Sequence, residues 1–197
     1  LTAIYEQTVS PILGSDFISM SVKAGLIGLI LVVVFMIIYY RLPGVLAGVT
    51  LMFYVAVVLA IFKLLPVTLS LAGIGGFVLS IGMAVDANVL IFERMKEELR
   101  MGRTLGAAVE AGFSRAWPAI RDSNVTTFIA TGILYWLGST VIASAPVMGF
   151  ALTLTIGVAI SMFTAVVATR TFLRILVGTR LGQKVSLFTV YSRREND

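Results

Sequence analysis

Residues 71–92 read LAGIGGFVLSIGMAVDANVLIF and decide the fold class of this chain. Only one of these residues, Asp86, is charged. A helix of this length rises about 33 Å, which matches the hydrocarbon core of a bilayer, about 30 Å thick. The run is much longer than a β-strand and lacks the polar–apolar alternation of a membrane barrel. It therefore predicts a membrane-spanning helix that carries one carboxylate.

The composition of the whole chain points to the same class. Its 197 residues are 58% hydrophobic and 13% charged, whereas soluble domains are about 45–50% apolar and about 25% charged. An integral membrane protein is therefore expected. The chain has no Cys and no His, which removes disulfides, the usual zinc ligands and the Ser-His hydrolase triad. No Walker phosphate-binding motif occurs, so we expect no enzyme, no cofactor, no metal and no nucleic-acid partner.

Four further apolar segments accompany residues 71–92, and each is close to the length needed to cross a bilayer. The segment 123–138 is the least apolar of them, because an Asn and three Thr residues interrupt it. We predict an all-α bundle of about five transmembrane helices within residues 22–168. Residues 1–21 are expected to be an extracytoplasmic lead-in, and residues 169–197 a basic cytoplasmic tail. The predicted spans are residues 22–40, 45–62, 71–92, 123–138 and 147–168.

The long connection at residues 93–121 is expected to be helical. After Thr104, a predicted N-cap, apolar residues recur at helical spacing until Pro118, which is expected to end the helix. Such an amphipathic cytoplasmic connector lies either along the membrane surface or against the bundle, and the sequence favours neither. The acidic residues of this connection are expected to lie on a solvated face: Glu93, Glu97, Glu98 and Glu110.

The distribution of basic residues predicts the orientation. With five spans, residues 41–44, 93–121 and 170–197 lie on one side of the membrane and hold 13 of the 15 Lys and Arg residues. Only Lys23 and Lys63 lie on the other side. Because basic loops stay in the cytoplasm, we expect the N-terminus of this chain outside and its C-terminus inside.

Asp86 is the candidate functional residue. It lies about 9 Å from the cytoplasmic end of its span, where an ionised carboxylate costs about 2.5–3.5 kcal/mol. The side chain can avoid this cost by taking up a proton, or by facing a partner or a wet cavity. No other acidic residue lies well inside a predicted span, so a functional role is favoured over simple helix packing.

Two rows of small residues run along the same predicted helix. Gly75 and Gly82 lie close to the face of Asp86 and predict close approach of another helix there. A second row, at intervals of four residues, consists of Ala72, Gly76, Ser80, Ala84 and Asn88. For Asn88 a packing role, worth about 0.6 kcal/mol on average, is favoured over a place in a proton path.

The fourth span offers polar neighbours for Asp86. Asn124 and Thr127 fall on one helical face, and Thr127 is expected at about the depth of Asp86. Arg121 lies near the same cytoplasmic mouth. These three residues are possible proton-path partners, although helix packing remains the favoured role for the threonines.

Several stretches resemble a known family. Residues 82–100, GMAVDANVLIFERMKEELR, resemble the signature of the SecD family, whose members assist Sec-dependent protein export in bacteria and archaea. The resemblance extends over nearly the whole chain, including EQTVSPILGSDFISMSVKAG, YRLPGVLAGVTLMFY and GFALTLTIGVAISMFTAVVATR.

The resemblance implies a six-span half of a transporter of the resistance-nodulation-division type, of which this chain would hold spans two to six. A first span and an external domain that grips unfolded preprotein would precede it. The implied partners are the homologous SecF half, separate or fused, the Sec channel and membrane lipid. The implied location is the cytoplasmic membrane. Asp86 would be the proton-carrying acid, and Arg121 would match a functional Arg of the partner half.

Two other functions remain open at this point. The chain could be half of a small-molecule or lipid exporter, which would need a substrate cleft in an external domain. It could also be a structural scaffold for the Sec channel, in which case Asn would replace Asp86 at little cost.

Overall fold

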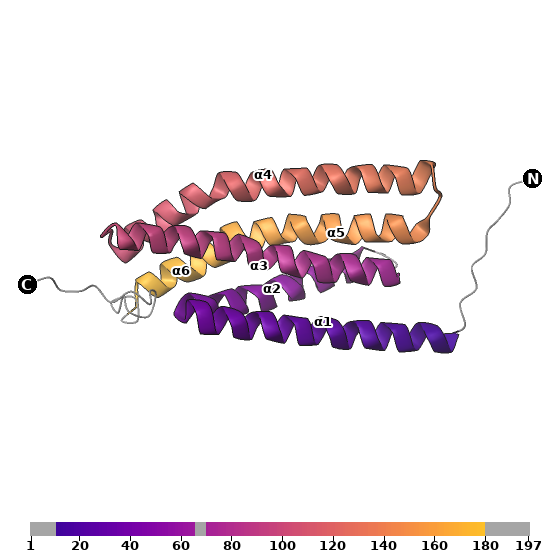
Figure 1. Cartoon of the computed structure of the whole chain (residues 1–197), viewed down its shortest axis with the longest axis horizontal. Helices are drawn as coiled ribbons and strands as arrows, with labels where there is room; N and C mark the ends of the chain where they lie inside the picture. Colours follow the sequence, from indigo (N-terminus) through magenta and orange to yellow (C-terminus); the bar gives the residue numbers. More distant parts are fainter. Residues whose placement is uncertain (1–10, 66–69, 180–197) are drawn as a thin grey trace, which may run out of the picture.

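The computed structural model describes residues 11–65 and 70–179. Within these ranges the chain is helical and contains no strand (Figure 1), which confirms the predicted all-α fold. Residues 1–10 of the predicted lead-in and residues 180–197 of the predicted tail lie outside the described residues. The elements are α1 (Pro11–Tyr40), α2 (Leu42–Leu64), α3 (Leu71–Arg100), α4 (Leu105–Thr140), α5 (Ala145–Thr164), the π-helix η1 (Ala165–Thr169) and α6 (Arg170–Val177).

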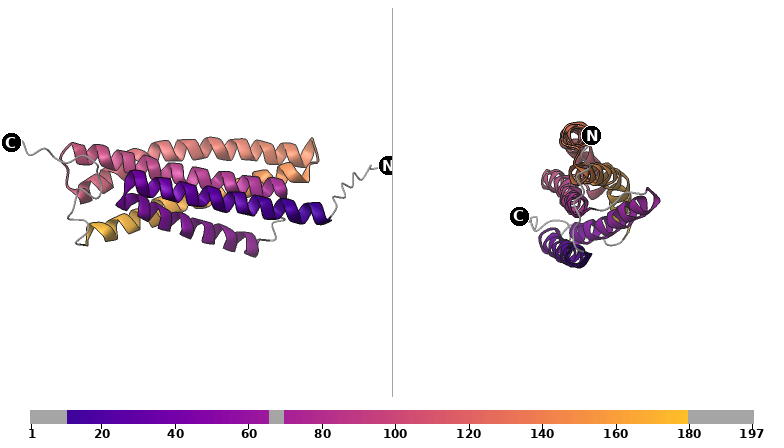
Figure 2. Two further views of the ribbon diagram at one scale, coloured as in Figure 1. Left: turned by 60° about the horizontal axis from the view of Figure 1, so that its bottom comes forward. Right: turned by 90° about the vertical axis from the view of Figure 1, so that its right-hand side faces the viewer.

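The five long helices run side by side along the long axis of the molecule (Figure 1). α3 packs mainly against α5 and α4, while α1 packs mainly against α2. α1 and α4 lie at opposite edges of the bundle (Figure 2). The α1–α2 turn, the α3–α4 hairpin and α6 lie at one end, on the left in Figure 1. We call this end, which holds most of the ion pairs, the charged end.

Four of the described helices are long and apolar enough to cross a membrane: Ile18–Tyr40, Leu42–Leu64, Leu71–Arg100 and Ala145–Val177. α4 is not among them, in keeping with the low apolar content of residues 123–138. Its polar side chains donate hydrogen bonds to carbonyls of their own helix, as in Asn124 to Ile120 and Thr131 to Phe128. This internal bonding lowers the cost of polar side chains in an apolar medium.

The predicted connector, residues 93–121, is not a separate element. α3 continues unbroken to Arg100, and α4 begins after the Thr104 N-cap and passes through Pro118. The prediction that Pro118 ends the helix was wrong. Pro118 and Ser114 both lie on the exposed face, so the Ser114 carbonyl that loses its donor is not sealed in the core. α4 changes direction in its N-terminal part (Figure 1), as helices containing proline do.

The apolar stripe of the connector packs against the bundle, which decides between the two alternatives left open by the sequence. Six of the seven stripe residues are buried: Leu105, Ala108, Val109, Gly112, Phe113 and Ala116. The seventh, Trp117, is exposed. A Cβ atom at Gly112 would lie only 2.9 Å from the backbone nitrogen of Met95. The ends of α3 and α4 therefore form a close-packed helical hairpin.

Glu98 holds this hairpin together, and the expectation that it is solvated was wrong. Its side chain is only 2% exposed. Nη1 of Arg115 donates to Oε1 of Glu98 at 2.7 Å, and Nε of Arg103 lies 2.9 Å from Oε2. The two guanidinium groups compensate the buried charge. Acidic residues on a solvated face and acidic residues under two arginines have the same sequence pattern, so the sequence could not separate them.

The beginning of the predicted tail is also structured. After η1 the last helix continues as α6, and its Arg170 and Arg174 both donate to the carboxylate of Glu110 on α4. The hydrogen bond from Arg174 is the largest cause, and that from Arg170 the second largest, of a pKa of Glu110 lowered to about 2. Because this pKa is depressed, the ion pairs of Glu110 stabilise the fold fully when the pH is above the usual Glu pKa near 4.5. This stabilisation is lost as the pH falls towards 2.

Candidate functional site

Asp86 lies near the middle of the long helix α3, with apolar residues on both sides along the chain. Its side chain is exposed at the surface of the bundle. In residues 11–65 and 70–179 it has no hydrogen-bond or ion-pair partner. An unpaired carboxylate in a membrane helix is costly, so this position needs either a proton or a partner from outside the described residues.

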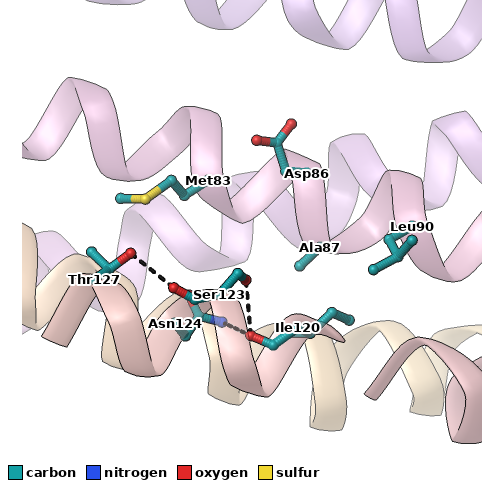
Figure 3. Close-up of a pocket in the computed structure, with 8 residues that line it drawn as sticks. All are labelled: Met83, Asp86, Ala87, Leu90, Ile120, Ser123, Asn124 and Thr127. Carbon is teal, nitrogen blue, oxygen red and sulfur yellow. Dashed lines mark hydrogen bonds between the residues drawn. The ribbon is translucent and has the colours of Figure 1, made fainter. Parts of the chain in front are cut away.

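A pocket of about 180 Å³ lies beside Asp86, between α3 and α4 (Figure 3). It is large enough for water molecules, and it offers polar groups to hold them. Eight residues line it: Met83, Asp86, Ala87 and Leu90 from α3, and Ile120, Ser123, Asn124 and Thr127 from α4. The fold thus brings Asn124 and Thr127, the two neighbours expected from the fourth span, to the same pocket as Asp86.

The pocket residues do not bond to Asp86 in this conformation. The carboxylate points away from α4 (Figure 3). Asn124 is buried and donates from Nδ2 to the Ile120 carbonyl at 2.8 Å, and Thr127 donates to the Ser123 carbonyl at 3.1 Å. No donor among the described residues reaches Oδ1 of Asn124. This oxygen is a hydrogen-bond acceptor beside the pocket.

Two of the proposed proton-path residues lie elsewhere. Arg121 is exposed, pairs with its neighbour Asp122 at 2.9 Å and does not line the pocket. Asn88 is buried and accepts a hydrogen bond from Thr169 at 2.7 Å. That bond joins α3 to η1, as expected of a residue that packs two helices together.

The prediction that Gly75 and Gly82 pack against another helix is not met within residues 11–65 and 70–179. A Cβ atom at either position would meet no atom within 4 Å. The second row of small residues makes the close contacts instead. A Cβ at Gly76 would lie 2.8 Å from the Phe150 carbonyl of α5. Both rows have small residues at helical spacing, so the sequence did not show which one meets α5.

Sequence reasoning missed the residues that face this second row. Tyr54 of α2 shares a buried hydrogen bond with Ser80 at 2.6 Å, and Thr153 of α5 donates to the Gly73 carbonyl at 2.9 Å. It also missed Ser123 in the pocket. The only signal for Ser123 was its position one helical turn before Thr127. For Tyr54 and Thr153 no local pattern identified the partner.

Comparison with known proteins gives the family. Residues 1–179 match the family model described as protein export membrane protein SecD/SecF, C-terminal. The chain belongs to this SecD/SecF family. The resemblance expected from residues 82–100 is thereby confirmed, and the chain is a multi-pass membrane protein.

Individual members of the SecD/SecF family are also similar to the chain. It is 66% identical to the protein translocase subunit SecD of Dehalococcoides mccartyi, over 100% of this chain and 44% of that protein. It is 56% identical to the SecD subunit of Synechocystis, over 88% of this chain and 36% of that protein. The chain therefore spans less than half the length of these relatives.

A solved structure shares the fold. The crystal structure of SecDF, a translocon-associated membrane protein from Thermus thermophilus, superposes with a TM-score of 0.82 and 38% identity. The match covers 87% of this chain and 23% of that one. The helical arrangement described above is thus that of a SecDF membrane region.

Proposed function

We propose that this chain is the membrane part of a subunit that uses the proton-motive force to assist Sec-dependent protein translocation, with Asp86 as the proton carrier. The observation that carries the proposal is an acid that has no partner among the described residues, on a membrane helix, at the edge of a polar pocket. Family membership supports the link to protein translocation. The Sec channel and unfolded preprotein, reached through an external domain outside this chain, are the proposed partners.

The exposed face of α3 supports a homologous SecF half as the direct neighbour. Asp86 and Gly82 are both exposed there, and Gly75 has open space around its Cα atom. A helix can approach closely over glycines, and a facing polar or basic group would lower the cost of the ionised acid. In this proposal Asp86 binds a proton while the polar or basic group of the SecF half is distant. It releases the proton when that group comes close.

The proposed orientation predicts the result of reporter fusions. With the charged end in the cytoplasm, a reporter at Thr104 and one after Asp197 should both report the cytoplasm, and one at Pro66 should report the outside. A reporter at Thr104 that is active on the outer side would reverse the orientation and place Asp86 nearer the outer mouth.

A liposome experiment tests proton carriage directly. Liposomes that contain only residues 1–197 should leak protons no faster than empty liposomes. No Lys or Arg side chain lines the pocket, so nothing there lowers the cost of ionised Asp86. The membrane potential supplies only about 2.3 kcal/mol per charge at 100 mV. Adding the homologous half, the missing first span and the external domain should create a leak that Asp86→Asn abolishes. An Asp86-dependent leak from residues 1–197 alone would show that a complete path exists within this chain.

A further inference from the structure

α1 is most deeply buried at its charged end. Among its described side chains only Met36 and Tyr40 are buried, and they lie one turn apart near the end of the helix. A Cβ atom at Gly44 would overlap the Met36 carbonyl, so α2 is packed tightly against this end. No other side chain of the α1 span is buried, although Leu29, Val32 and Val33 are half-buried and pack against the core.

The other half of α1 has little contact with α3. A Cβ atom at Gly25 would just touch Cγ2 of Val78, at 3.4 Å, and a Cβ at Gly28 would meet nothing within 4 Å. A helix that is fixed at one end and loosely packed at the other can tilt about its fixed end without opening the core.

The fixed end of α1 meets α3 at a buried lysine. The ammonium nitrogen of Lys96 lies 4.1 Å from the centre of the Tyr40 ring and 4.7 Å from that of Tyr39. Oε1 of Glu93 accepts a hydrogen bond from Lys96 at 3.0 Å. The Tyr40 ring also packs against Phe92, at 5.6 Å between centres. We call Tyr39, Tyr40, Glu93 and Lys96 the Lys96 cage.

The chemistry of the Lys96 cage suits a joint that turns without separating. The electron-rich faces of two aromatic rings attract an ammonium group over a range of angles, unlike a hydrogen bond, which weakens steeply when bent. Lys96 is 8% exposed, so water does not screen this attraction as it would at the surface. Lys96 and Asp86 are ten residues apart on one uninterrupted helix, which is about 15 Å.

We propose that the Lys96 cage is the pivot about which α1 tilts, and that it couples this tilt to α3, so that Lys96 is a positioning residue for Asp86. The inference rests on the proposed function, because the tilt matters only if Asp86 carries protons. Loading of Asp86 shifts α3, the cage passes this shift to the fixed end of α1, and the loosely packed half of α1 moves furthest.

Disulfide formation between α1 and α3 measures this movement. Residues 1–197 contain no Cys, so Gly25→Cys with Val78→Cys gives one defined pair at the loosely packed level once any Cys elsewhere in the full-length protein and its homologous half is replaced. The experiment uses the full-length protein with its homologous half in membrane vesicles, with and without a proton gradient. We expect the rate of disulfide formation to depend on the gradient in the parent protein. Lys96→Met should abolish this dependence, and Lys96→Arg should keep it.

Two further variants make the test specific. Arg94→Met removes a cation from the same turn of α3, where Arg94 pairs with Glu97 at the surface, and should leave the gradient dependence intact. Tyr39→Leu removes one wall of the cage from a side chain that is already half exposed. It should weaken the dependence even if Lys96→Met does not assemble.

The outcomes separate the pivot from the proposed function. If the rate of disulfide formation still depends fully on the gradient in Lys96→Met or Tyr39→Leu, the pivot is overturned. The pivot is also overturned if this rate does not depend on the gradient in the parent protein. Gradient dependence that persists in Asp86→Asn would overturn the proton-carrier role instead. Loss of dependence in Asp86→Asn together with its retention in Lys96→Met would reject the pivot alone and leave the proposed function standing.

Discussion

Replacing Asp86 with Asn is expected to abolish the part of protein export that depends on the proton-motive force. Asn keeps the size of the side chain and its ability to hydrogen-bond, but it cannot bind and release a proton. Asp86 has no partner among the described residues, so the fold of this chain should not change. The measurement is transport of a preprotein into inverted membrane vesicles with and without a proton gradient. Asp86→Asn should lower the gradient-dependent rate to that of vesicles lacking the protein.

Two further substitutions of acidic residues serve as controls for Asp86→Asn. Asp86→Glu keeps the acid but extends it by one methylene group, so it should restore part of the rate. Asp122→Asn removes a carboxylate that is 65% exposed and that, in the part of the chain the structure describes, pairs only with its neighbour Arg121, so it should leave the rate unchanged. Normal gradient-dependent export with Asn at position 86 would reject the proton carrier and favour a structural scaffold for the Sec channel.

The Gly157→Ala variant is expected to have the largest effect on stability. A Cβ atom at Gly157 would overlap both Cβ and Oγ of Ser80 and would lie 3.0 Å from the Tyr54 hydroxyl. Because Cβ of Ser80 is fixed to the α3 backbone, α3 and α5 would have to separate. We expect the free energy of unfolding to fall by about 1–3 kcal/mol, the usual cost of overpacking.

Gly82→Ala is the matched control, because it adds the same methyl group to α3 where no atom lies within 4 Å. Its free energy of unfolding should stay the same or rise by up to about 1 kcal/mol, since Ala favours helix more than Gly does. Unfolding of both variants in mixed detergent micelles, followed by circular dichroism, gives the comparison. Equal stability of Gly157→Ala and Gly82→Ala would show that the α3–α5 contact can relax.

The site residues that the sequence predicted correctly as neighbours were found from helical geometry. Asp86 stands out because it is the only charge in residues 71–92. Asn124 and Thr127 follow from their common helical face and from counting residues inwards from the α3–α4 hairpin. Arg121 was placed near the mouth by the same counting, but its guanidinium pairs with Asp122. Counting gives the position of a residue along its helix, whereas the direction of a long flexible side chain depends on its neighbours.

The sequence by itself determined that this chain is a helical membrane protein, because apolar runs of about 20 residues have no other stable arrangement in a bilayer. It also marked Asp86 as the one charge in residues 71–92, and it indicated the family through residues 82–100. Only the tertiary structure decided which row of small residues on α3 meets α5, whether Glu98 is buried, and whether Pro118 interrupts α4. The physical reason is the same in each case. These outcomes depend on which surface of a neighbouring helix lies opposite, and residues on such a surface, like Gly157 opposite Ser80, are far apart in the sequence.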